Sequence, residues 1–241
     1  MNKISVEVMD QGMEIFSPND KQVKKLFIPS NNPTLKLVYL RENESIALYS
    51  QNSLIITKPK ITTHGIQTAA GFLAGMNSNK YDIIHGCGLA YQNKGIVIAG
   101  HSGSGKTTIA GFFEENASNE DNVRILDDDL LAVDGTYMET IGRFGARTSF
   151  EDGIKKRIMN KTKTAKQAIN LVFLLDPSMR GGEYKYHDGS MPREYTVPDN
   201  LNANLQKEYI KGAPIKVQAQ VYIIGTDDGK EKTLDTILKL L

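Results

Sequence analysis

Alternation of apolar and polar residues in the first 60 or so positions predicts short β-strands. The alternation runs through Ile4–Val8 and Leu35–Tyr39, and apolar or β-branched residues fill Ser45–Tyr49 and Leu54–Thr57. Turn-forming Gly, Pro, Asn and Asp residues separate these segments. We therefore expect a small β-rich unit at residues 1–60, which carries no obvious chemistry of its own.

The rest of the chain, residues 61–241, mixes helical and strand patterns, which is typical of an α/β domain. The expected helices cover Thr68–Gly75, Thr107–Asn116 and Lys230–Leu241, and the expected strands cover Tyr81–Tyr91, Ile96–Ala99, Val123–Leu126, Ala168–Leu175 and Ile215–Ile223. Residues 177–200 are polar and rich in Gly, Pro and Tyr. They predict a long excursion, and such segments are usually functional or disordered.

Composition narrows the class of protein. Of the 241 residues 40% are hydrophobic and 24% are charged, so we expect a packed core. A formal net charge of +1 argues against a nucleic-acid-binding protein, and the single Cys fits a reducing compartment. The sequence shows no apolar run long enough for a membrane helix and no signal peptide at its N-terminus, so a cytoplasmic globular protein is expected.

The segment Gly100–Thr107 fits the pattern G-x-x-x-x-G-K-[ST], and it lies between a predicted buried strand and a predicted helix. Glycines let several backbone N–H groups point at an anion, and the helix adds the positive end of its dipole. Lys106 would reach the β- and γ-phosphates, and the Thr107 hydroxyl would bind Mg²⁺. The alternative is a glycine-rich turn without a ligand. The residues expected to bind the nucleotide are Gly100, Ser102, Gly103, Ser104, Gly105, Lys106, Thr107 and Thr108.

Three consecutive acids, Asp127–Asp129, follow the strand predicted over Val123–Leu126. Asp127 lies 21 residues after Lys106, which leaves room for a helix and a turn and makes a right-handed βαβ crossover feasible. The acids and the loop would then share the carboxyl edge of one sheet. One carboxylate would hold Mg²⁺ and another would accept a proton. The alternative for such a run is a polar turn or a helix cap. For Asp129 we expect this alternative, with its side chain either capping a helix or facing solvent.

His85 lies near the loop if the strands on either side of Asn93 form a hairpin. A turn centred on Asn93 places His85 opposite residue 101, or opposite residue 102 if the centre moves by half a position. There it would contact the γ-phosphate, the metal or the acceptor, the alternative being a structural histidine. We regard His64, His101 and His187 as incidental and Cys87 as a small strand residue, because no partner of a nucleophile accompanies it.

Together, Ile84-His85-Gly86, the loop Ala99–Thr108 and Leu126–Asp129 resemble the HPr kinase/phosphorylase family and its serine-kinase relatives. In that family a His-Gly pair precedes a strand and a G-x-S-G-x-G-K-[ST] loop, and an Asp pair follows. His85 and Lys106 are 21 positions apart, a separation similar to the family's own. The resemblance, over residues 81–135, implies the P-loop core that this family shares with phosphoenolpyruvate carboxykinases, preceded here by the N-terminal β-rich unit.

The resemblance also implies roles for individual residues. Loop amides and Lys106 would bind the phosphates of ATP, Thr107 and Asp128 would bind Mg²⁺, Asp127 would be the catalytic base, and His85 would lie near the transferred group. Gly142–Arg147 resembles an Arg- and Gly-rich stretch of the family, so that Arg143 or Arg147 would stabilise the phosphoryl group, unless they are surface arginines. Relatives often form oligomers, and a homo-oligomer is compatible with the resemblance.

These features predict an ATP-dependent kinase that phosphorylates a hydroxyl, most simply a serine of a protein or peptide or free serine. Two other hypotheses share the same core. One is a carboxykinase-like enzyme acting on a small carboxylic acid, although such enzymes are usually longer. The other is a non-catalytic nucleotide sensor that meets a partner through residues 177–200. No nucleic-acid or membrane partner is expected.

Overall fold

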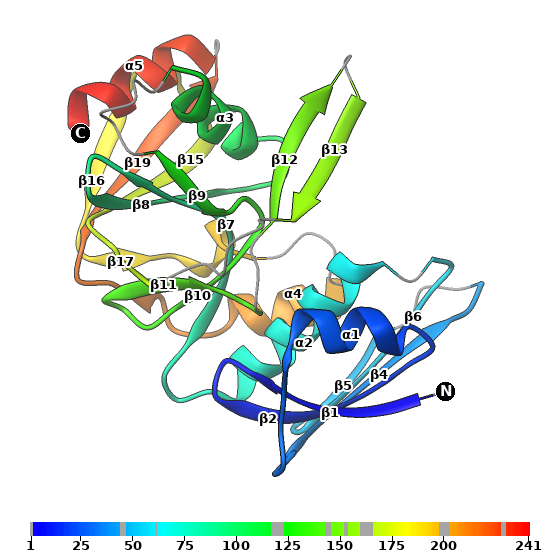
Figure 1. Cartoon of the computed structure of the whole chain (residues 1–241). Helices are drawn as coiled ribbons and strands as arrows, with labels where there is room; N and C mark the ends of the chain where they lie inside the picture. Colours follow the sequence, from blue (N-terminus) through cyan, green and yellow to red (C-terminus); the bar gives the residue numbers. More distant parts are fainter. Residues whose placement is uncertain are drawn as a thin grey trace.

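The computed structural model has a mixed α/β fold with two large sheets and the helix α2 between them (Figure 1). The structure describes residues 2–43, 47–60, 62–116, 123–142, 146–151, 154–159, 166–197, 203–227 and 230–241. None of the helices in these ranges combines the length and the apolar character that crossing a bilayer requires.

Six strands from the first 58 residues form the N-terminal sheet, in the order β3-β1-β2-β4-β6-β5. They are β1 (Asn2–Val8), β2 (Gln11–Ser17), β3 (Ile28–Pro29), β4 (Leu35–Arg41), β5 (Ala47–Ser50) and β6 (Ser53–Lys58). Alternate side chains of β4 are buried, which confirms the strand predicted there. The strand β2 alternates in the same way but is not predicted from the sequence. Ser45, expected to start a strand, lies outside the described residues. The short helix α1 (Asp20–Leu26) is not predicted by the sequence, because only Val23 and Leu26 of it are buried.

Helix α2 (Thr63–Asn77) belongs to the cores of both parts of the molecule. Ile66 and Leu73 share a buried cluster with the strands of the N-terminal sheet. Gly71 and Gly75 allow close approach to the second sheet, since a Cβ atom at Gly71 would lie 2.6 Å from Ile141. A boundary between two domains at residue 60 therefore stays a prediction.

The second sheet has nine strands, eight of them in the order β14-β11-β10-β7-β8-β15-β19-β16, with β9 paired to β7. They are β7 (Asp82–Tyr91), β8 (Lys94–Gly100), β9 (Arg124–Asp127), β10 (Leu130–Val133), β11 (Tyr137–Thr140), β14 (Gln167–Ala168), β15 (Leu171–Arg180), β16 (Tyr184–His187) and β19 (Gln220–Asp227). The strands β8, β15 and β19 are parallel. Helices α3 (Lys106–Asn116) and α5 (Lys230–Leu240) bury Phe113 and Ile237 in one cluster with these strands, which confirms both predicted helices.

Two smaller pairs of strands and two short helices complete the fold. They are the hairpin β12 (Ala146–Glu151) with β13 (Ile154–Met159), the pair β17 (Ser190–Met191) with β18 (Ile215–Lys216), the 3-10 helix η1 (Arg193–Tyr195) and the helix α4 (Ala203–Ile210). In Figure 1 the hairpin projects beside α3.

Two expectations for the second half of the chain are wrong. Residues 177–197 are not one excursion, because β15 extends to Arg180 and β16 pairs with β19; residues 198–200 lie outside the described residues. The single strand expected over Ile215–Ile223 is two strands, since β18 pairs with β17 and β19 pairs with β15. Alternating burial runs from β18 into the first residues of β19, so the pattern does not reveal where the partner strand changes.

Candidate functional site

The loop 100–107 joins β8 directly to α3, so the strand–loop–helix context of the glycine-rich motif is confirmed. Gly100, Gly103 and Gly105 have φ angles of +153°, +78° and +101°, which favour glycine. A Cβ atom at Gly100 would lie 2.8 Å from both the Leu175 carbonyl oxygen and Ser104 Oγ. The glycines therefore allow a tight bend at the start of α3, as a loop that cradles an anion requires.

Lys106 and Ser104 are the buried polar side chains of this loop. Lys106 Nζ donates to the carbonyl oxygens of Gly100, at 2.7 Å, and His101, at 2.9 Å, which folds the lysine back over the loop. Ser104 Oγ has no hydrogen-bond partner in the described part of the chain. A phosphate oxygen would satisfy this hydroxyl, so the loop fits a phosphate ligand. Of the other predicted ligands, Ser102, Gly103 and Thr108 are exposed and Gly105 and Thr107 are half-buried.

The carboxyl ends of β8 and β9 meet on β7, which lies between them. Ala99 pairs with Gly86, and Asp127 pairs with Gly88, so the loop and the acids attach two residues apart on β7. Because β7 is antiparallel to both strands, β8 and β9 run parallel to each other, with α3 connecting them in sequence. Two parallel strands joined by α3 are therefore present as predicted, with β7 inserted between them, and the right hand of the crossover stays a prediction.

A tight turn holds the acidic run in place. Asp127 is fully buried, and its Oδ1 accepts hydrogen bonds from the backbone N–H groups of Asp129, at 3.0 Å, and Leu130, at 3.2 Å. These two bonds fix the orientation of the Asp127 carboxylate and let the chain enter β10. Asp128, in the middle of the turn, is also buried.

The pKa of the Cys87 thiol on β7 is affected by the charges of Asp127, Asp128 and Lys106. Burial raises its pKa well above the ordinary value, Asp128 and Asp127 raise it further, and Lys106 lowers it. All three charged groups therefore lie close enough to act on one buried atom. Cys87 itself is a fully buried strand residue, which confirms the prediction for it.

Asp129 joins two histidines from distant parts of the chain. Its Oδ1 lies 3.2 Å from His85 Nε2 on β7, and its Oδ2 lies 2.7 Å from His64 Nε2 in the first turn of α2. The backbone N–H of His85 also donates to the carbonyl oxygen of Thr196, at 2.7 Å. Asp129 is thus a bridge rather than the cap or solvent-facing acid that the sequence suggested. His64 takes part in this cluster although nothing in the sequence singled it out.

The β7–β8 register brings His85 to the loop, with a small correction. Gly86 pairs with Ala99, which places His85 beside Gly100 and not opposite residue 101 or 102. The turn contains only two residues, Gln92 and Asn93, with φ angles of +48° and +65°. Such a two-residue turn matches the twist of a hairpin, and its centre lies half a position before Asn93.

Sequence reasoning missed Asp176, which directly follows the buried part of β15. Leu175 pairs with Gly100, so Asp176 lies next to the loop. Its carboxylate accepts hydrogen bonds from the hydroxyls of Ser178, at 2.7 Å, and Tyr195, at 2.8 Å. Burial alone would raise the pKa of Asp176, but these hydrogen bonds outweigh it and lower the pKa. An acid at the carboxyl end of a buried parallel strand was the signal that could have identified it.

Two parts of the predicted site cannot be placed. Arg143 lies outside the described residues, and Arg147 lies on β12, of whose side chains nothing is described. Within the described ranges, no three His, Cys, Asp or Glu side chains are grouped so that they could hold a metal ion. Mg²⁺ does not need such a group, because it usually keeps waters and phosphate oxygens among its ligands.

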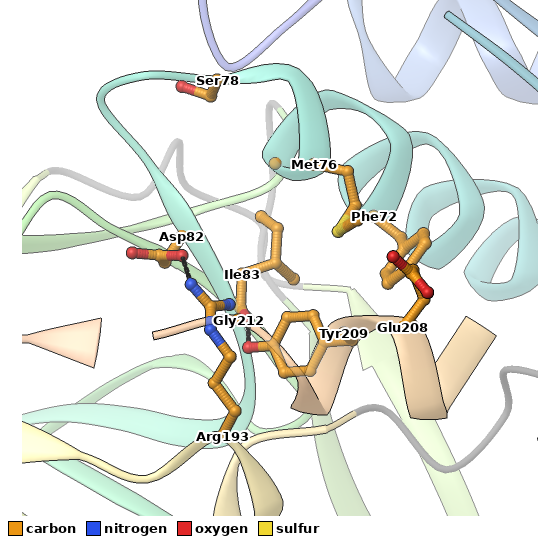
Figure 2. Close-up of a pocket in the computed structure, with 10 residues that line it drawn as sticks. Phe72, Met76, Ser78, Asp82, Ile83, Arg193, Glu208, Tyr209 and Gly212 are labelled. Carbon is orange, nitrogen blue, oxygen red and sulfur yellow. Dashed lines mark hydrogen bonds and ion pairs between the residues drawn. The ribbon is translucent and has the colours of Figure 1, made fainter. Parts of the chain in front are cut away.

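A cavity of about 240 Å³ lies beside β7, between α2 and α4 (Figure 2). Arg193 Nη2 lies 2.6 Å from Asp82 Oδ1, and its guanidinium group lies over the ring of Tyr209. The Tyr209 hydroxyl donates to the carbonyl oxygen of Ile83, two residues before His85. The polar groups that line this cavity therefore form their hydrogen bonds and ion pair with one another. Through Tyr209 they hold β7 in place, and they do not indicate a class of ligand.

Comparisons with known proteins add little to this geometry. No family model and no curated protein matches the chain. Among solved structures, the chain is similar to an Hpr(Ser) kinase/phosphatase from Coxiella burnetii, with 11% identity over 66% of this chain and 91% of that chain. The TM-score of 0.29 is too low to support an argument about function.

Proposed function

We propose that this chain is an ATP-dependent kinase that transfers the γ-phosphoryl group to a hydroxyl, such as that of a serine. The observation that carries the proposal is the meeting of β8 and β9 on β7. It brings the glycine-rich loop and the pair Asp127–Asp128 to one edge of the sheet. In open α/β sheets, ligands bind outside the carboxyl ends of the strands.

The loop would hold the phosphates of ATP. Its backbone N–H groups and Lys106 would offset the charge on the β- and γ-phosphates, and the buried Ser104 hydroxyl would donate to a phosphate oxygen. Thr107 and Asp128 would hold Mg²⁺ together with phosphate oxygens and water. When bound, the metal stabilises the negative charge that develops during transfer.

Asp127 would act on the acceptor. Its Oδ1 is fixed by two backbone amides, so the carboxylate is already oriented. The acceptor oxygen forms a bond to the γ-phosphorus while the bond from that phosphorus to the bridging oxygen of ADP breaks. The hydroxyl proton passes to the Asp127 carboxylate, and the electron pair of the broken bond leaves with ADP. His85, oriented by Asp129, would contact the transferred group, and Arg143 is a further candidate for this contact.

Labelled ATP tests the proposal. We would incubate the protein with γ-labelled ATP and Mg²⁺ against free serine, serine peptides and small acids, and find where the label goes. A kinase forms a phosphoester that survives hydroxylamine. Asp127→Asn should abolish transfer and leave ATP affinity within about twofold, because removal of a general base costs about 10²–10⁴ in rate. Lys106→Ala should weaken ATP binding itself.

The exposed acid Asp188 supplies a control, since Asp188→Asn should change neither quantity. Full turnover by Asp127→Asn would contradict the assignment of the base. Label that appears on a small acid, and not on serine or a peptide, would favour the carboxykinase-like alternative. ATP binding without transfer to any acceptor would favour the nucleotide sensor.

A further inference from the structure

A second cavity, of about 210 Å³, lies where the start of α2 meets β4 and β6. Lys58, Lys60 and His64 line it, together with polar groups of Tyr39 and Thr68. None of the residues that line it is acidic. We refer to it as the basic cavity.

His64 is paired with Asp129, but the two lysines of the basic cavity have no counter-charge among the described residues. Lys58 and Lys60 form no ion pair with any residue that the structure describes. The N-terminus of α2, capped where the Thr62 side chain accepts from the Gly65 N–H at 3.0 Å, adds a partial positive charge to the same place. An anionic group in the cavity would offset this charge and accept charge-assisted hydrogen bonds.

The dimensions of the basic cavity limit what it can hold. Pockets for drug-sized ligands usually measure about 300–1,000 Å³, so this one suits an acid group on a short carbon chain. Gly65 keeps it open, since a Cβ atom there would clash with the hydroxyl of Tyr39. Lys58 is half-buried and Lys60 is exposed, so the cavity communicates with solvent.

One side chain separates the basic cavity from the acidic turn of the candidate site. His64 lines the cavity, and its Nε2 lies 2.7 Å from Asp129 Oδ2. The other oxygen of Asp129 contacts His85, beside the phosphate loop. A molecule whose acid group occupies the cavity would therefore lie close to His64 and Asp129, the residue next to the acids proposed to act on the acceptor.

We propose that the basic cavity binds the carboxylate or phosphate group of a small hydroxyl-bearing acceptor, held by Lys58, Lys60 and His64. This inference rests on the proposed kinase function and narrows its substrate to a small hydroxy acid or a small phosphorylated alcohol. Lys58 and Lys60 act in binding, and they take no part in the transfer of the phosphoryl group.

Histidine ring signals in proton NMR provide a test that does not depend on turnover. The chain has only four histidines, which single His→Gln variants assign. We would titrate the protein with glycerate, glycerol 3-phosphate and glycerol, which share a three-carbon chain and differ in their acid group. The His64 signal should move with one or both acids and stay unchanged with glycerol, while His187, on β16, serves as the internal control.

Variants make the test specific. Lys58→Met and Lys60→Met should each raise the dissociation constant of the bound acid about tenfold, the loss of one charged contact. Lys21→Met removes an exposed charge from α1, outside the cavity, and should change nothing. If no acid moves the His64 signal, if glycerol moves it equally, or if Lys21→Met weakens binding as much as Lys60→Met, the inference is wrong.

This experiment can distinguish failure of the basic-cavity proposal from failure of the proposed kinase function. Addition of MgATP should move the ring signal of His101, which lies in the phosphate loop, and this tests nucleotide binding alone. A response of His101 without any response of His64 to the acids would overturn the basic cavity and leave the kinase standing. Glycerate carries a carboxylate and glycerol 3-phosphate carries a phosphate, so a comparison of the two shows which anionic group the cavity binds.

Discussion

His85 Nε2 lies 3.2 Å from Asp129 Oδ1, and this contact orients the imidazole ring next to the glycine-rich loop 100–107. The partner is the third acid of the run and not either acid of the proposed catalytic pair. The acidic turn therefore both carries charge to the site and positions the histidine.

Asp129→Asn should impair transfer more than binding. The substitution weakens the contacts to His85 and His64, and a small displacement of a group at the reacting centre costs about 10²-fold in rate. We expect turnover to fall by about that factor and ATP affinity to stay within about twofold. Steady-state kinetics and calorimetry with MgATP measure the two effects. Equal losses in both would show that Asp129 supports the loop itself.

Gly100→Ala should distort the glycine-rich loop 100–107. The residue has a φ of +153°, and its new methyl group would meet the Leu175 carbonyl oxygen at 2.8 Å. We expect a loss of about 1–3 kcal/mol in the free energy of unfolding, measured in urea, and a weaker affinity for MgATP. Gly111→Ala is the matched control, because nothing lies within 4 Å of its Cβ position in α3, and it should stabilise by about 0.5–1 kcal/mol.

Asp134 should contribute to stability at neutral pH but not in acid. It accepts hydrogen bonds from the Thr136 and Tyr137 amides and from Lys166 Nζ at 2.5 Å. Burial raises its pKa, but these bonds outweigh burial and lower it. Its contribution is therefore present above the ordinary pKa of about 3.9 and disappears as the pH falls through the lowered value. Asp134→Asn should cost about 1–3 kcal/mol at pH 7, and its urea midpoint should approach the wild-type midpoint in strong acid.

Tyr209→Phe should weaken the support of β7. The phenol donates to the Ile83 carbonyl oxygen and lies 3.1 Å from Thr196 Oγ1, so its loss should cost about 1–3 kcal/mol in the free energy of unfolding. Burial raises the pKa of Tyr209 to about 12. In the unfolded chain the Tyr209 phenol ionises near pH 10, whereas in the folded protein it stays protonated up to about pH 12. The free energy of unfolding of the wild type should therefore decline between about pH 10 and 12. Circular dichroism should show a shallower decline for Tyr209→Phe; equal slopes would contradict this explanation.

The sequence predicts the regular parts of the fold well. The run Ile96–Thr107 identifies a buried strand, a loop and a helix because each has a local signature: apolar residues, glycines and helical spacing. Alternation similarly identifies β1 and β4. The helix α1 could not be predicted from the sequence, since seven residues with two buried positions are too few to show helical periodicity. The division between β18 and β19 escapes because a change of partner strand leaves no mark on alternation.

The candidate site is predictable only where its residues belong to one local motif. His85 follows from the hairpin, although its register needed the two-residue turn. His64 could not be found, because its place depends on how α2 packs between sheets that are distant in sequence. The helix was expected to begin at Thr68, since Gly65 weakens the helical pattern of the first turn. Its actual start, at Thr63, is what brings His64 to Asp129.

Helix α2 links the N-terminal strands to the candidate site. Its first turn contributes His64, and its later turns pack closely against Ile83 and Ile141 through glycines. A chimera that exchanges residues 2–58 alone would pair foreign strands with the native helix and replace Lys58 while it keeps His64. Transfer of the proposed basic cavity to another protein would therefore require moving the strands and α2 as one block, with an acid at the position of Asp129 in the recipient.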